Sequence, residues 1–110
     1  MPNYLRGDVV LVDLGMAAKV RPCVVVSIGH PDSQRNMSIV VPMTSEIRHS
    51  ENEISFPKPP WLRQTSVVNL MGIVGVDNAR IQRRIASFPP AAMAAIDQGL
   101  ARVLGLPQPF

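Results

Sequence analysis

Apolar and polar positions divide the chain into short strand-like segments followed by one amphipathic helix. Runs rich in valine and isoleucine indicate strands, because β-branched residues suit a pleated, half-buried surface. The predicted strands cover residues 8–14, 23–28, 38–44, 52–56 and 66–76. Segment 23–28 is apolar on both faces, so we expect it at the centre of a sheet. Segment 52–56 is short and is expected at an edge.

Proline and glycine mark where the predicted strands are interrupted. Pro42 breaks the period-2 alternation of residues 38–44. Proline cannot donate a ladder hydrogen bond, so this strand lies at an edge or bends at that point. Gly72 and Gly75 fall inside segment 66–76, where a sheet would need to curl.

The last part of the chain has helical periodicity. Within residues 91–104, one face collects Met93, Ile96, Leu100, Val103 and Leu104. Gly105 and then Pro107 are typical of a helix end. Two prolines occupy the helix start, which leaves Ser87 as the nearby side chain able to cap it. The predicted fold is mainly β: a small, strongly curved, mostly antiparallel sheet, barrel-like and SH3-like, with one C-terminal helix.

Composition limits the class of protein. The chain has 110 residues, of which 46% are hydrophobic, which suits a single domain over residues 1–110 and excludes a disordered tail. Its apolar runs are far shorter than the ~20 residues of a membrane span. The start lacks the pattern of a signal peptide, so we expect a cytoplasmic protein. Cys23 is the sole cysteine, which excludes a disulfide or a cysteine-rich metal site and suits a core residue. No metal or cofactor is expected.

The net charge of +3 is a mild bias toward polyanions. Nine of the eleven cationic residues are arginine. The guanidinium group holds phosphate through two hydrogen bonds and stacks on bases. Coding bias in a chain rich in alanine, proline and arginine explains the same counts equally well, so the positions of the arginines matter more than their number.

Ordered motifs along the chain resemble the MazF/PemK family of toxin endoribonucleases. They are Arg6-Gly7-Asp8-Val9-Val10 with Val12-Asp13, then Arg21-Pro22-Cys23-Val24-Val25-Val26-Ser27, then Val41-Pro42-Met43-Thr44-Ser45, then Ser66-Val67-Val68-Asn69 with Ile73 and Arg80, and finally the helix pattern ending in Leu104-Gly105-Leu106. Each motif alone is weak, but together they cover almost the whole chain in the family's order.

The resemblance implies a homodimeric toxin of a type II toxin–antitoxin pair. Such enzymes cut single-stranded RNA without a metal, and most leave a 2′,3′-cyclic phosphate and a 5′-hydroxyl. The family's catalytic arginine falls on Arg21 and its catalytic threonine on Thr44. The implied antitoxin is a small protein whose acidic tail covers the RNA groove. This chain departs from many relatives in its short connection from Asp13 to Arg21, where Met16 and Ala17 replace a longer polar loop.

The chemistry of RNA cleavage favours the same two residues. Attack by a ribose 2′-hydroxyl builds charge on the phosphate, and an arginine strengthens its hold as that charge grows. A threonine hydroxyl donates to another phosphate oxygen. Arginine has a pKa above ~12, so Arg21 suits a phosphate clamp better than a general base. The alternative is that Arg21 merely pairs with Asp13 or Glu46.

Several other polar residues are candidates for RNA contact. Lys19 is a candidate phosphate contact, and Ser45 follows Thr44 directly. Gln64 and Asn69 either read base edges or are polar positions on a half-exposed strand. The RNA-binding set is completed by the densest basic cluster, Arg80, Arg83 and Arg84, which follows an RNA backbone or an acidic antitoxin tail, or is simply a solvated strand edge. Trp61 stacks on a base or, as we prefer, plugs the barrel or a dimer interface.

Three alternative hypotheses stay open at this point. His30 and His49 form a rival acid–base pair, because imidazole carries protons near neutral pH; both lie in polar turns outside the motifs. A CcdB-like toxin that binds DNA gyrase without catalysis has no need of Arg21 or Thr44. An RNA-binding module that does not cut is the third class, and the short loop before Arg21 keeps it open.

Overall fold

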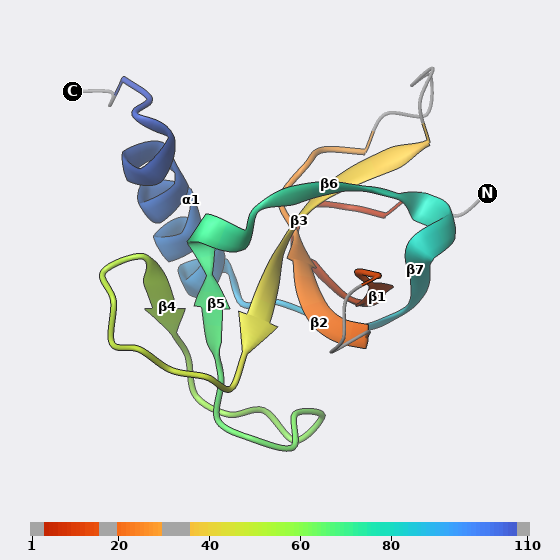
Figure 1. Cartoon of the computed structure of the whole chain (residues 1–110), viewed down its shortest axis with the longest axis horizontal. Helices are drawn as coiled ribbons and strands as arrows, with labels where there is room; N and C mark the ends of the chain where they lie inside the picture. The colour runs from red at the N-terminus through yellow and green to blue at the C-terminus, as the bar shows by residue number, and fades with distance from the viewer. Residues whose placement is uncertain (1–3, 16–19, 30–35, 108–110) are drawn as a thin grey trace.

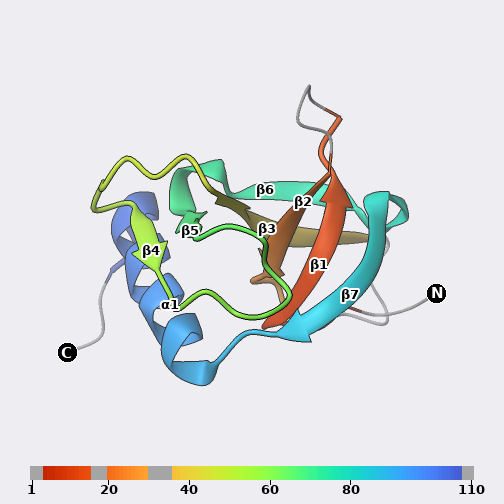
Figure 2. The same ribbon diagram turned by 90° about the horizontal axis from the view of Figure 1, so that it is seen from below.

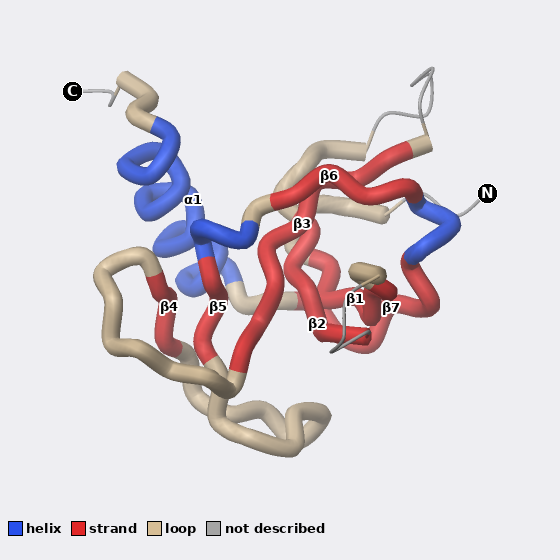
Figure 3. Tube along the Cα trace, in the orientation of Figure 1, coloured by secondary structure: helices blue, strands red, loops and turns tan. Residues whose placement is uncertain are grey.

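The computed structural model describes residues 4–15, 20–29 and 36–107. Seven strands and one long helix make up most of this part of the chain (Figures 1 and 3). The strands are β1 (Asp8–Asp13), β2 (Val20–Val25), β3 (Met37–Thr44), β4 (Glu53–Ser55), β5 (Val67–Asn69), β6 (Val74–Asp77) and β7 (Ile81–Ser87). Two 3₁₀ turns, η1 (Leu70–Gly72) and η2 (Asn78–Arg80), flank β6, and helix α1 (Pro90–Leu104) follows β7.

The strands form one curved antiparallel sheet around β3. The strand order is β4-β5-β3-β2-β1-β7, and β6 pairs with the first half of β3. Strands β6 and β7 are joined through η2, so β1, β2, β3, β6 and β7 surround a common interior (Figure 2). The prediction of a mainly β, strongly curved antiparallel sheet with one C-terminal helix is confirmed. Strand β4 lies at the end of the order, as expected for the segment at 52–56.

Two apolar clusters lie on opposite faces of the central strands, which explains why these strands are apolar at successive positions. Inside the barrel lie Val10, Val12, Cys23, Val25, Val40, Val76 and Ile81. Between the other face and helix α1 lie Val9, Val24, Val41, Met43, Val68, Leu70, Phe88, Met93, Ile96 and Leu100. The central position expected for segment 23–28 is therefore confirmed, although β2 begins at Val20 and ends at Val25.

Pro42 lies inside the sheet, so the edge interpretation of its strand is wrong. On one side Pro42 pairs with Cys23 of β2. On the other side β3 changes partner at this point: residues 37–40 pair with β6, whereas Met43 and Thr44 pair with β5. Proline is tolerated because no second ladder passes through its position.

The single strand predicted over residues 66–76 is also wrong. The chain pairs with the end of β3 as β5 and must step past Pro42 before it pairs with the start of β3 as β6. Turn η1 makes this step and buries Leu70 completely. A Cβ on Gly72 would lie 2.7 Å from Cγ of Pro42, so only glycine fits this approach.

Strand β7 was not predicted as a separate strand. Its burial pattern does not alternate, because register shifts against β1 place three consecutive exposed residues, 82–84, in its middle. Strand β7 has a single partner, β1, and forms the other end of the sheet.

Helix α1 starts one residue before the predicted range and ends where predicted. It buries Met93, Ile96 and Leu100 against the sheet, whereas Leu104 is half-exposed and does not belong to the buried face. Gly105 ends the helix in the left-handed conformation, with φ of 67°. Ser87 is not the cap: it belongs to β7, and Pro89 occupies the cap position without a side-chain hydrogen bond.

Candidate functional site

The structure brings Arg21 and Thr44 together at one end of the sheet. Arg21 is the second residue of β2, and Thr44 is the last residue of β3. The β2–β3 register pairs Cys23 with Pro42, and extending it by two residues sets Arg21 opposite Thr44. Both positions share the sheet face of Cys23 and Pro42, because side chains alternate along a strand. Segments far apart in the sequence thus supply two neighbouring side chains.

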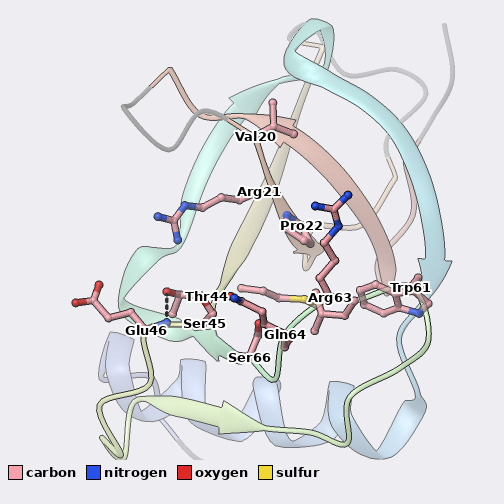
Figure 4. Close-up of a pocket in the computed structure, with 12 residues that line it drawn as sticks. Val20, Arg21, Pro22, Thr44, Ser45, Glu46, Trp61, Arg63, Gln64 and Ser66 are labelled. Carbon is pink, nitrogen blue, oxygen red and sulfur yellow. Dashed lines mark hydrogen bonds between the residues drawn. The ribbon is translucent and has the colours of Figure 1, made fainter.

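Two cavities meet at this pair of residues. The first, which we call cavity A, has a volume of about 710 Å³ (Figure 4). It is lined by Val20, Arg21, Pro22, Met43, Thr44, Ser45, Glu46, Trp61, Leu62, Arg63, Gln64 and Ser66. The second, cavity B, has a volume of about 620 Å³. It is lined by Leu14, Arg21, Pro42, Thr44, Glu46, Arg48, Glu53, Asn69, Gly72 and Val74. Arg21, Thr44 and Glu46 line both.

The guanidinium group of Arg21 forms no ion pair with any residue that the structure describes. The pairing of Arg21 with Asp13 or Glu46, considered above, is therefore wrong. Glu46 instead accepts a hydrogen bond from Arg48 at 2.8 Å, and Asp13 accepts the backbone N–H of Gly15 at 2.8 Å. Arg21 is half-buried at the wall between two open cavities, where its charge has no counter-ion within the described chain.

The hydroxyl of Thr44 is held by a backbone hydrogen bond. Its Oγ1 accepts the N–H of Glu46 at 3.1 Å (Figure 4). A hydroxyl has one proton to donate beside its acceptor lone pairs, so the accepted bond leaves that proton available to a ligand. Figure 4 also shows the carboxylate of Glu46 turned away from Thr44.

Cys23 follows Arg21 by two residues on β2, and its side chain lies in the apolar interior of the barrel. Its side chain is completely buried, which confirms the prediction of a core residue. Burial raises the pKa of the Cys23 thiol from 9.0 to about 12, although the nearby Arg21 charge acts in the opposite direction. The thiol is therefore neutral near pH 7 and takes no part in charge balance at Arg21.

Some of the other predicted RNA-binding residues line these cavities and others do not. Ser45 and Gln64 line cavity A, and Asn69 lines cavity B. Lys19 lies outside the described residues.

None of the three residues of the basic cluster lines cavity A or cavity B. Arg83 and Arg84 are exposed on the edge strand β7, and Arg80 belongs to η2. Arg84 pairs with the buried Asp8 at 3.5 Å, so part of its role is to neutralise an acid in the fold. The solvated-edge interpretation agrees with this location.

The structure does not bring His49 into either cavity. His49 is exposed, has a φ of 54°, and lies in the loop after Thr44 without lining cavity A or B. His30 lies outside the described residues.

Four charged residues that line the cavities were not predicted there: Glu46, Arg48, Glu53 and Arg63. Arg63 and Trp61 reach cavity A from the connector between β4 and β5 (Figure 4). The half-buried Trp61 packs against the cluster under α1 and not against the cluster inside the barrel, so it does not plug the barrel. Its place in a dimer interface stays a prediction. Prolines at positions 57, 59 and 60 dominate this connector, and such a composition carries no signal of a binding site.

Two further observations concern metals and membranes. Among the described residues, no three His, Cys, Asp or Glu side chains gather in a way that would hold a metal ion. Within the same part of the chain, no helix is both long and apolar enough to cross a bilayer.

The fold and the sequence together define the class of this protein. Residues 5–104 match the family described as PemK-like, MazF-like toxin of type II toxin-antitoxin system. The chain therefore belongs to the PemK/MazF toxin family, as the motifs in the sequence indicated.

Solved structures from this family are similar over nearly the whole chain. An endoribonuclease from a mycobacterial species, in complex with its cognate antitoxin, is 27% identical with a TM-score of 0.81; the match covers 96% of this chain and 99% of that one. A second mycobacterial endoribonuclease is also 27% identical, with a TM-score of 0.79 and coverage of 99% and 98%. The MazE–MazF complex of Deinococcus radiodurans shares the fold at 19% identity, with a TM-score of 0.79 and coverage of 97% and 100%.

Proposed function

We propose that this protein is a toxin endoribonuclease that cuts single-stranded RNA without a metal ion. The observation that carries the proposal is the convergence, between two cavities, of an oriented Thr44 and an Arg21 that has no ion-pair partner among the described residues. A strand of RNA that fills both cavities passes the two side chains at the point where the cavities meet. The mycobacterial relatives that are named endoribonucleases support the same activity.

In the proposed reaction, the ribose 2′-oxygen forms a bond to the adjacent phosphorus while the bond to the 5′-oxygen breaks. The 2′-hydroxyl loses its proton to a base that we do not assign, and the departing 5′-oxygen takes up a proton. The products are a 2′,3′-cyclic phosphate and a 5′-hydroxyl. No oxidant or metal is needed for this balance.

Arg21 and Thr44 have distinct roles in this reaction. The guanidinium of Arg21 donates to two phosphate oxygens, and this interaction strengthens as charge builds up in the transition state. Thr44 donates its proton to another phosphate oxygen, oriented by the hydrogen bond that its Oγ1 accepts from Glu46. An arginine side chain stays protonated at working pH, so Arg21 is not the general base.

The proposed partners are an antitoxin and a second copy of the chain. One mycobacterial relative was solved with its cognate antitoxin. For this chain we propose a small protein with an acidic tail, which would meet the uncompensated arginines of cavity A. We also propose a homodimer: Met37 and Ile39 are half-exposed apolar side chains on the outer face of β3, a surface that a second copy would cover.

One assay separates the three function classes. End-labelled single-stranded RNA is incubated in EDTA with wild-type protein, Arg21→Ala and Thr44→Ala, and the product ends are identified. We expect cuts at a few defined sites, cyclic-phosphate ends, and loss of cutting in both variants with unchanged circular dichroism. Intact RNA together with gyrase-dependent DNA breaks would instead favour the gyrase poison. Binding without cleavage would leave a non-cutting RNA-binding module.

The rival histidine pair needs its own variant. Replacing His30 and His49 together with alanine should leave RNA cutting within about twofold of wild type, since the described His49 lines neither cavity. A large loss of cutting in this double variant would transfer the acid–base role to the histidines.

A further inference from the structure

Arg63 is the second arginine of cavity A, and the family motifs do not include it. It is exposed, and it takes part in none of the ion pairs between described residues. We infer that Arg63 binds an RNA phosphate next to the one held by Arg21 and so positions the substrate across cavity A. This inference rests on the proposed function.

In the connector between β4 and β5, a short exposed arch at residues 63–65 lies between the buried residues Leu62 and Ser66. Before the arch, Leu62 is 8% exposed and its N–H donates to the carbonyl of Pro59 at 3.1 Å. After the arch, Ser66 is 6% exposed and its hydroxyl donates to the carbonyl of Gln64 at 3.0 Å. Residues 63–65 are thus an exposed segment between two buried residues, and this arrangement places Arg63 in the lining of cavity A.

The charges around cavity A favour an anion. Arg21 and Arg63 contribute two positive charges to its lining, and Glu46 is the single acidic residue among the described residues that line it. Glu46 is already bound to Arg48 at 2.8 Å. Figure 4 shows the guanidinium groups of Arg21 and Arg63 on the two sides of Pro22, with Thr44 below Arg21 and Gln64 between Thr44 and Arg63. Two like charges that have no ion-pair partner in the described part of the chain gain from a polyanion that passes between them.

Arg63 and its neighbour Gln64 suit different parts of an RNA strand. A guanidinium fork fits phosphate oxygens, which every nucleotide presents, so Arg63 adds affinity without sequence preference. Gln64 follows Arg63 and offers both an amide donor and a carbonyl acceptor, the groups that read base edges. Arg63 therefore affects how tightly the strand is held, and Gln64 is placed to affect which base is bound beside it.

The salt dependence of RNA binding tests this role. Fluorescence anisotropy measures the binding of a labelled, mixed-sequence 2′-O-methyl RNA, which lacks the attacking hydroxyl and stays uncut. Each phosphate contact on a single strand contributes about 0.7 to the slope of log K against log salt. We expect Arg63→Ala to reduce that slope by about 0.7 and to weaken binding about tenfold at low salt. Arg63→Lys should keep the slope, because one cation still meets the phosphate.

Lys58→Ala is the matched control. Lys58 is an exposed cation of the same connector, it lines neither cavity A nor cavity B, and its loss changes the net charge equally. For Lys58→Ala, the slope of log K against log salt should equal that of wild type. An unchanged slope in Arg63→Ala, or an equal change in Lys58→Ala, would overturn the inference. If the wild-type protein binds the RNA but never cuts an unmodified strand, the proposed cleavage is wrong while the role of Arg63 in binding stands. If the wild-type protein does not bind RNA at all, both the proposed cleavage and the role of Arg63 are wrong.

Discussion

The contact between Gly99 and Leu70 gives the sharpest test of how the helix packs on the sheet. A Cβ added at Gly99 would lie 2.3 Å from Cδ1 of Leu70 and 3.6 Å from Cδ1 of Ile54. Leu70 is fully buried under α1, so its side chain has little space into which to move. The side chain of Leu70 therefore occupies the space that a side chain at residue 99 would need.

The two single substitutions should both destabilise the protein, for opposite reasons. Leu70→Ala removes three carbon groups, worth about 0.8 kcal/mol each, and leaves a cavity, which gives a loss of about 2–5 kcal/mol. Gly99→Ala overpacks the site at about 1–3 kcal/mol, offset by about 1 kcal/mol of better helix propensity. Its net effect is a loss of about 1 kcal/mol.

The double variant should reveal the coupling between these residues. Once Leu70 is alanine, the methyl group at residue 99 enters open space, and the gain of about 1 kcal/mol in helix propensity remains. Gly99→Ala should therefore change sign, from destabilising in wild type to stabilising in Leu70→Ala. The coupling energy is about 2 kcal/mol, within the range found for residues in contact.

Urea denaturation followed by circular dichroism and by the fluorescence of the single tryptophan measures all four proteins. Leu104→Ala is the control partner, because Leu104 lies half-exposed on the same helix. It should show an additive effect with Gly99→Ala. If Gly99→Ala costs the same free energy in the wild-type and Leu70→Ala backgrounds, the packing described for α1 is refuted.

Three further predictions concern the core, the helix end and the site. Burial raises the pKa of Cys23 to about 12; the unfolded thiol ionises near 9, so the stability that this burial contributes is complete below pH 9 and lost as the pH rises toward 12. Cys23→Ala should flatten that pH dependence of the urea midpoint. Gly105→Ala should cost about 1 kcal/mol of stability in the same assay, because φ is 67° there while nothing lies within 4 Å of an added Cβ. Thr44→Val should abolish most RNA cutting, whereas Thr44→Ser retains the hydroxyl and should cut, as a gel assay of end-labelled RNA shows.

The sequence predicted those parts of the fold that depend on local pattern. The continuous apolar run in β2 indicated a strand buried on both faces, and the helical spacing of Met93, Ile96 and Leu100 indicated the buried face of α1. Features set by pairing between distant segments were missed. Pro42 lies at a change of partner along β3, and this change also divides segment 66–76 into β5 and β6. Neither the local composition of a segment nor its alternation of apolar and polar residues indicates which strand will pair with it.

In the candidate site, too, residues within local motifs were predicted, whereas residues placed by contacts between distant segments were not. Arg21 and Thr44 were predicted from motifs, and their convergence depends on the β2–β3 register. Arg63 had no such motif, because its place in cavity A depends on how the connector folds between the buried Leu62 and Ser66. The partners of Glu46 and Asp13 were also beyond the sequence: both lie near Arg21 along the chain, but each forms its hydrogen bond with another residue.

We propose that Arg21 stabilises the transition state of RNA cleavage. The most direct measurement is the rate of cutting at saturating RNA in EDTA, for wild type and Arg21→Ala with equal circular dichroism spectra. We predict that the variant cuts on the order of 100- to 1,000-fold more slowly, the usual loss when a group that stabilises transition-state charge is removed. Cutting by Arg21→Ala at the wild-type rate would contradict the account and place the catalytic groups elsewhere in the molecule.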